Sequence, residues 1–293
     1  MERRISAVGL WVLCLLAAAI ILPAAASAQI PPAAAFVPFL DVRCYDILDQ
    51  PPLGVPLRLD HLNPYFQSLG LPAEDVVLRE PQQLCVPVAK NDNFPPDDVR
   101  RFISYVDWKC YGIEGPPLDI YVRLTQLNRV IAEMVGPDLR VIVREPQQLC
   151  VPVAKNGDFP PPDVLELVQW LDVKCYRVEA GQFLNGPIRL THLNPLFADL
   201  PPEFTEFVEA APTQLCVPVA KNGWFPPHHA YNQVAYSDVL CYNLRGRPLN
   251  MDLQLDHLNP VLREMGLPPE FVFVGDAEEL CVPVAKEDYF PPF

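Results

Sequence analysis

One seven-residue stretch occurs four times in this chain without a single change. The copies of Leu-Cys-Val-Pro-Val-Ala-Lys span residues 84–90, 149–155, 215–221 and 280–286. Their cysteines follow one another at intervals of 65, 66 and 65 residues, a period longer than that of the common helical solenoid repeats and sufficient for a very small domain. The sequence therefore predicts four tandem repeats, at residues 39–96, 105–161, 170–227 and 236–293.

Disulfides are expected to hold each repeat together, because a unit of about 65 residues buries only ~60% of the surface that its unfolded chain exposes. Apart from Cys14 near the N-terminus, the chain has eight cysteines, two in each repeat. Pairing within repeats uses all eight in the same way, whereas pairing across repeats leaves Cys44 and Cys281 at opposite ends of the chain. Each bond would contribute roughly 4 kcal/mol in the chain-entropy model. The predicted disulfides are Cys44–Cys85, Cys110–Cys150, Cys175–Cys216 and Cys241–Cys281.

Residues 1–28 have the features of a secretory signal peptide. A short basic segment precedes an apolar run, and the small residues Ala26-Ser27-Ala28 offer a cleavage site before Gln29. The alternative is an uncleaved membrane anchor, which Pro23 just before the cleavage site disfavours. We expect an exported chain, secreted or held in the periplasm or at the cell surface, with no transmembrane anchor after cleavage. Residues 29–38 are rich in alanine and proline and are expected to form a flexible tether.

Each repeat is expected to contain four short strands and one short helix. Apolar residues alternate around the first cysteine, as at Leu40, Val42 and Cys44, and again in the heptapeptide. The pair Asn63-Pro64 is typical of a helix N-cap followed by the first helical position. The predicted fold class is mainly β with short helices, built as four disulfide-locked small sheets or sandwiches that pack on one another. The proline of each heptapeptide predicts either a strand at a sheet edge or a strand position whose N–H would be free of a strand partner.

Three repeats carry a histidine just before this helix, and the second repeat carries a glutamine there. These residues are His61, Gln126, His192 and His257. Because the second repeat lacks the histidine, a strand-to-helix junction explains the motif better than an acid/base or metal-binding role. The cysteines form no C-x-x-C pair and no known catalytic motif is present, so we predict no catalytic residue, no metal site and no cofactor.

Two other repeated residues are candidates for contact with a ligand. In every repeat a tyrosine follows the first cysteine and a lysine ends the heptapeptide, and Trp224 lies in the turn after the third heptapeptide. The candidates are Tyr45, Tyr111, Tyr176, Tyr242, Trp224, Lys90, Lys155, Lys221 and Lys286. The alternative for the tyrosines is packing in the core or between repeats.

An aspartate also precedes each first cysteine by three residues. These aspartates are Asp41, Asp107, Asp172 and Asp238. If the disulfide brings the two strands of a repeat together, each aspartate meets the lysine that ends the heptapeptide. We expect an exposed pair in each repeat, which would contribute at most ~1 kcal/mol to stability.

The chain is acidic, with 36 acidic and 22 basic residues. It has no basic stripe to neutralise phosphates, which argues against nucleic-acid binding. Four equivalent units suit weak multivalent binding, and the variable loops between the cysteines are the expected place for specificity. We therefore expect an exported, non-enzymatic protein with a structural or multivalent binding role and an extracellular protein or polysaccharide as partner. An array of glycan-binding modules and a hydrolase are the alternatives.

The segments Cys44-Tyr45 and Pro81 to Asn91 resemble a secreted bacterial repeat family of unknown function. Its pattern is Cys-Tyr, then Leu-Thr-Asp-Gln-Phe-Gly, then Pro-x-x-Leu-Cys-x-Pro-Val-x-Lys-Asn. This chain departs from the pattern in the middle, at residues 60–64. The resemblance implies export and a disulfide framework and supplies no catalytic residues.

Overall fold

The computed structural model describes residues 29–48 and 50–293, so the predicted signal peptide lies outside the described residues. A helical segment precedes each repeat: α1 (Ala33–Phe36) with the 3-10 helix η1 (Val37–Phe39), α3 (Asp97–Ile103), α5 (Pro162–Val168) and α6 (His228–Ala235). The first repeat contains β1 (Val42–Leu48), β2 (Pro56–His61), α2 (Pro64–Ser68), β3 (Glu74–Val77) and β4 (Pro81–Lys90). The second contains β5 (Trp108–Gly112), β6 (Ile120–Gln126), α4 (Arg129–Val135) and β7 (Asp138–Lys155). The third contains β8 (Val173–Ala180), β9 (Leu184–His192), the 3-10 helix η2 (Pro195–Phe197), β10 (Glu203–Ala210) and β11 (Pro212–Lys221). The fourth contains β12 (Val239–Asn243), β13 (Met251–His257), α7 (Pro260–Glu264) and β14 (Glu270–Lys286).

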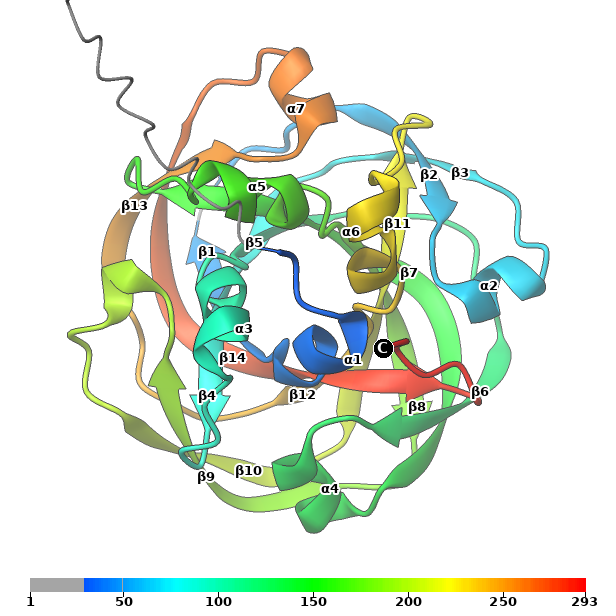
Figure 1. Cartoon of the computed structure of the whole chain (residues 1–293), viewed down its shortest axis with the longest axis vertical. Coiled ribbons are helices and arrows are strands. Elements are labelled where there is room, and N and C mark those ends of the chain that lie inside the picture. The colour runs from blue at the N-terminus through cyan, green and yellow to red at the C-terminus, as the bar shows by residue number, and fades with distance from the viewer. Residues whose placement is uncertain (1–28, 49) are drawn as a thin grey trace, which may run out of the picture.

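Eight strands form a closed ring of antiparallel neighbours. In each repeat the strand with the first cysteine pairs with the heptapeptide strand of its own repeat and with that of the preceding repeat. The first strand, β1, has no preceding repeat and pairs instead with β14 from the end of the chain. The order around the ring is therefore β1, β4, β5, β7, β8, β11, β12, β14 and back to β1. Figure 1 shows these strands arranged around a common centre.

The second strand of each repeat lies outside the ring and pairs with the repeat two positions away. Strand β2 of the first repeat pairs with residues 219–221 of β11, and β9 of the third repeat pairs in return with residues 88–90 of β4. The second and fourth repeats make the same exchange through β6 with β14 and β13 with β7. Each repeat therefore makes strand pairs with all three others.

The prolines of the heptapeptides lie where one neighbouring strand replaces another. Along one side of β4, β5 pairs as far as Cys85 and β9 begins at Val88, with Pro87 between them. Another residue at this junction would have a backbone N–H without a strand partner, whereas proline has no N–H. The Pro87 carbonyl accepts a hydrogen bond from the Leu193 N–H at 2.9 Å. The expectation of an edge strand is therefore wrong, because β4 has neighbours on both sides, and the alternative, a position whose N–H would be free, is correct.

Four helices cover one end of the ring, near its centre in Figure 1. Helices α1, α3, α5 and α6 contact one another in this cyclic order. The flexible tether expected at residues 29–38 is wrong, because α1 occupies the place that the other three helices fill in their own repeats and buries Ala33 and Phe36. The ends of the described chain meet here, since the Ala34 N–H donates to the Pro292 carbonyl at 2.9 Å.

The predicted fold class, mainly β with short helices and four regularly spaced disulfides, is confirmed. The structure adds that the repeats contribute their strands to one shared sheet. A two-stranded unit is marginally stable by itself in water, so sharing gives each pair of strands the neighbours that it needs. In the described part of the chain, no helix is long and apolar enough to cross a membrane.

Candidate functional site

The eight cysteines of the repeats face the inside of the ring and form the four predicted disulfides. Each bond joins two residues that are directly opposite in neighbouring strands, as Cys44 is to Cys85. Successive disulfides are also close together: Cys85 Sγ lies 3.9 Å from Cys110 Sγ, and Cys281 Sγ lies 3.8 Å from Cys44 Sγ. The eight sulfur atoms therefore form a closed circle inside the sheet.

The four Asp–Lys pairs form as predicted, but they are buried rather than exposed. The pairs are Asp41–Lys90, Asp107–Lys155, Asp172–Lys221 and Asp238–Lys286. Their side chains are between 0% and 4% exposed. The lysines therefore cannot contact a ligand from solution, and the expectation that they do is wrong.

Each aspartate also accepts a hydrogen bond from the asparagine that caps the short helix of the next repeat around the ring. Asn128 Nδ2 donates to Asp41 Oδ2 at 3.0 Å. The equivalent bonds are Asn194 to Asp107 at 2.7 Å, Asn259 to Asp172 at 2.5 Å and Asn63 to Asp238 at 2.5 Å. The asparagines thus cap their own helices, as predicted, and also join neighbouring repeats.

Burial determines the protonation of these pairs. Loss of hydration raises the pKa of Asp41 to about 6, although Lys90 and Asn128 oppose the shift. Loss of hydration also lowers the pKa of Lys90, although Asp41 opposes it. The other three pairs shift in the same directions for the same reason. In every pair, burial favours the neutral carboxyl and the neutral amine.

The four tyrosines are buried between the ring and the outer strands, and each is hydrogen-bonded to the repeat two positions away. The pairs, with the distance from Oη, are Tyr45–His192 (3.2 Å), Tyr111–His257 (3.3 Å), Tyr176–His61 (3.2 Å) and Tyr242–Gln126 (3.1 Å). No tyrosine of the four is more than 1% exposed. Contact with a ligand is therefore excluded for them, and the alternative of packing between repeats is correct.

Three of these pairs belong to a larger cluster with a cation and a glutamate. Lys174 Nζ lies 2.5 Å from Glu74 Oε2, beside Tyr176 and His61. The equivalent ion pairs are Lys109–Glu270 and Arg43–Glu203. In the fourth cluster, Leu240, Leu139 and Gln126 stand where the others have the cation, the glutamate and the histidine. The cation, the glutamate and the histidine are thus replaced together, as expected of three side chains that contact one another.

The charges of this cluster are balanced inside it. Burial alone would raise the pKa of Glu74, but hydrogen bonds from His61 and Lys174 lower it to about 2. Burial lowers the pKa of His192 to about 4, with a further contribution from Arg43. His192 is therefore neutral at neutral pH, in which state it serves Tyr45 as a hydrogen-bond partner.

An open cavity lies at the end of the ring opposite the helices, where the heptapeptide strands begin. Its volume is about 460 Å³, and we call it the polar mouth. The residues that line it are Gln83, Glu206, Asn243, Leu244, Arg245, Glu278 and Glu279. A second cavity of about 480 Å³ adjoins it and shares Gln83 and Glu278. Arg245 and Gln50, one in each cavity, belong to the variable loops between the cysteines.

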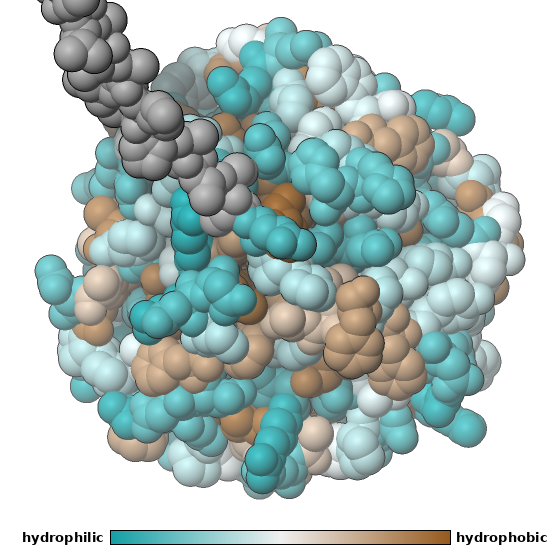
Figure 2. Space-filling model, in the orientation of Figure 1, coloured by the Kyte–Doolittle hydropathy of each residue, from teal (hydrophilic) through white to brown (hydrophobic). Residues whose placement is uncertain are grey.

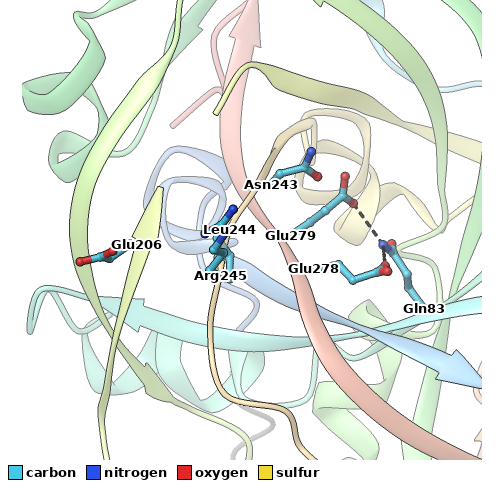
Figure 3. Close-up of a pocket in the computed structure, with 7 residues that line it drawn as sticks. All are labelled: Gln83, Glu206, Asn243, Leu244, Arg245, Glu278 and Glu279. Carbon is cyan, nitrogen blue, oxygen red and sulfur yellow. Dashed lines mark hydrogen bonds between the residues drawn. The ribbon is translucent and has the colours of Figure 1, made fainter. Parts of the chain in front are cut away.

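Glu279 is the central residue of the polar mouth. Gln83 Nε2 donates to Glu278 at 2.7 Å and to Glu279 at 3.4 Å, as Figure 3 shows. Burial raises the pKa of Glu279 against hydrogen bonds from Thr213 and Gln83. Amides and carboxyl groups of this kind can hydrogen-bond to the hydroxyl groups of a sugar or to the backbone of a peptide.

A metal is poorly suited to this place. Glu279 lies close to the sulfur atoms of Cys241 and Cys281, which is the only such group among the described residues. Both cysteines are consumed by their disulfide, so no thiolate is available as a ligand.

Trp224 remains exposed, in contrast to the other candidates. It is 42% exposed, and the phenylalanine that follows each heptapeptide turn is similarly accessible. These residues are Phe94, Phe159, Phe225 and Phe290, with exposures of 41–52%. Each follows a strand that ends at the helical end of the ring. On this face apolar side chains occur as small patches among polar ones (Figure 2).

The polar mouth and the tyrosine clusters were not predicted. The joint replacement of His61, Glu74 and Lys174 by Gln126, Leu139 and Leu240 is a signal of the cluster that the sequence contains. This signal can be recognised only when it is known that opposite repeats pair their outer strands. Comparisons with protein-family models, with curated proteins and with solved structures found no match to this chain.

Proposed function

We propose that this chain is an exported, non-enzymatic scaffold that binds an extracellular polysaccharide or protein through its variable loops. One observation carries the proposal. The polar residues that recur in every repeat bond to one another inside the molecule, whereas residues of the variable loops, such as Arg245 and Gln50, line the two adjoining cavities. A rigid frame with loops of differing sequence is the usual design of a binding protein.

The disulfides support export, because such bonds persist in oxidising compartments outside the cytosol. The burial of His61, His192 and His257 supports a non-enzymatic role, since each is held by a tyrosine. A hydrolase would need at least one acid/base group that a substrate can reach.

A binding screen of the mature protein on a glycan array tests the proposal. We expect Arg245→Ala together with Glu206→Gln to weaken binding at least tenfold. Arg129→Ala is the matched control, since this exposed arginine lies on α4, away from the polar mouth. Equal binding by all three proteins would refute the role of the polar mouth. A hydrolytic turnover that His192→Ala abolishes would refute the non-enzymatic role.

A second candidate function, an array of glycan-binding sites, is favoured by the exposed aromatics at the helical end. Aromatic faces stack on sugar rings, and four equivalent weak sites gain affinity together. Loss of glycan binding in the variant with Phe94, Phe159, Phe225 and Phe290 all changed to serine would favour this second function. The matched control changes three other exposed aromatics, Tyr121, Phe204 and Phe271, to serine.

A further inference from the structure

The buried Asp–Lys pair leaves the lysine with little to solvate its charge. An ammonium group has three N–H donors, and Asp41 is the one ionic partner that the described residues offer Lys90. Aromatic rings border two of the other lysines: Lys286 Nζ lies 5.2 Å from the centre of the Phe66 ring, and Lys155 Nζ lies 5.4 Å from that of Phe197. An ion pair in such a place loses more hydration than one contact returns. The pair is therefore better accommodated as two neutral groups.

We propose that the lysine and the aspartate of each pair condense in the folded protein to an amide cross-link. The four cross-links would be Asp41–Lys90, Asp107–Lys155, Asp172–Lys221 and Asp238–Lys286. Each would enclose the disulfide of its own repeat, since Asp41 lies three residues before Cys44 and Lys90 lies five residues after Cys85.

The reaction needs no oxidant, reductant or cofactor. The neutral amine of the lysine adds to Cγ of the protonated aspartate, and a C–N bond forms. The C–O bond to one carboxyl oxygen then breaks, and the hydroxyl leaves with a proton from the nitrogen as water. One water is released for each amide formed.

The fold supplies what this reaction requires. Neighbouring strands hold Lys90 Nζ in direct contact with the Asp41 carboxyl group, which replaces a bimolecular encounter by an intramolecular one. The Asn128 amide donates to Asp41 Oδ2, where negative charge develops when the amine adds. Burial shifts both pKa values toward the neutral amine and the protonated carboxyl, so the reactive forms are more populated than they are in water. After condensation the amide carbonyl retains Asn128 as its donor, and no buried charge remains.

The chain contains its own control. Its other two lysines, Lys109 and Lys174, are also buried, and each contacts a glutamate, Glu270 or Glu74. Hydrogen bonds to these glutamates outweigh their burial and lower the pKa of each to about 2. Both therefore remain carboxylates, which amines do not attack. We expect amide bonds at the four aspartate pairs and none at these two glutamates.

Intact-mass spectrometry of the mature protein after full disulfide reduction tests the proposal. The expected mass is lower, by the mass of four waters, than the mass calculated for the mature chain without cross-links. Tandem mass spectrometry of a proteolytic digest should then find the peptide with Asp41 joined to the peptide with Lys90. Peptides with Lys109 and Lys174 should be unmodified. Lys90→Met should restore the mass of one water and leave the other three cross-links in place.

A reduced wild-type mass equal to the mass calculated for the chain without cross-links would overturn the proposal. So would a cross-linked peptide that contains Glu74 or Glu270 in place of the aspartates. The wild-type measurement needs no variant, so it decides the question even if Lys90→Met does not fold.

Discussion

Cys44 and Cys281 are separated by 237 residues in the chain, and their Sγ atoms lie 3.8 Å apart. They meet because β1 pairs with β14 and closes the ring, with Cys281 opposite Val42. The large separation of Cys44 and Cys281 in the sequence therefore does not mean that they are far apart in the fold. The pairing within repeats is nevertheless correct, because Cys85 is the residue directly opposite Cys44.

This proximity predicts a new disulfide. The double variant Cys85→Ser/Cys241→Ser leaves Cys44 and Cys281 without their partners, and we expect them to bond to each other under oxidising conditions. Non-reducing peptide mapping would detect this link between the first and last repeats. In the control Cys85→Ser/Cys216→Ser, Cys44 and Cys175 lie on opposite sides of the circle of sulfurs, so two free thiols should remain. Two free thiols in both variants would contradict the prediction.

Helix α1 should stabilise the whole ring. Phe36, the last residue of α1, is 0% exposed, so Phe36→Ala should lower the free energy of unfolding by ~3–5 kcal/mol. Urea denaturation followed by circular dichroism would measure the change. Phe204→Ala is the matched control, because Phe204 is 74% exposed and its loss should cost less than ~0.5 kcal/mol. Equal stability of the two variants would show that α1 contributes nothing.

The contribution of His192 to stability should fall in mild acid, because His192 must remain neutral in the folded state. Its pKa is about 4 when folded and 6.5 in the unfolded reference, so the unfolded chain takes up the proton first as the pH falls. The contribution of His192 to the free energy of unfolding should drop by roughly 3 kcal/mol between pH 6.5 and 4, and no further at lower pH.

The variant His192→Gln isolates this effect. Gln126 already serves Tyr242 as a hydrogen-bond partner, so glutamine at position 192 should serve Tyr45 in the same way. Urea denaturation of both proteins as a function of pH should show the wild type losing stability relative to the variant between pH 6.5 and 4. Parallel curves would show that His192 does not titrate as expected.

Export should leave Gln29 as the first residue. N-terminal sequencing of the protein recovered outside the cytosol of its host would identify the cleavage site. Ala26→Leu together with Ala28→Leu removes the small residues and should block cleavage. A wild-type protein that retains residues 1–28 would support the alternative of a membrane anchor.

The sequence was sufficient for the local features of this fold. Alternating apolar residues such as Leu84, Val86 and Val88 predict a strand, and Asn63 with Pro64 predicts the start of a helix. Fourfold symmetry then selects one disulfide pattern. These features depend on residues that are close in the chain or related by the repeat.

Contacts between repeats could not be predicted in the same way. Nothing near Tyr176 indicates that His61 is its partner, because 115 residues separate them and the exchange of strands depends on closure of the ring. The same limit applies to Lys90, which the sequence alone predicts to be exposed. Lys90 lies opposite Leu190 of the third repeat, and its partner Asp41 accepts a hydrogen bond from Asn128 of the second, so its surroundings come from residues far away in the chain.

Closure also fixes the copy number of the repeat. An open solenoid can gain or lose a unit at either end during evolution and keep the geometry of the remainder. Here a fifth unit added at either end of the chain would have to enter between β14 and β1, which would widen the ring and separate every pair of opposite repeats. Circular permutation is the change that the architecture tolerates, because Ala34 and Pro292 already touch and the chain could begin at any of the four repeats.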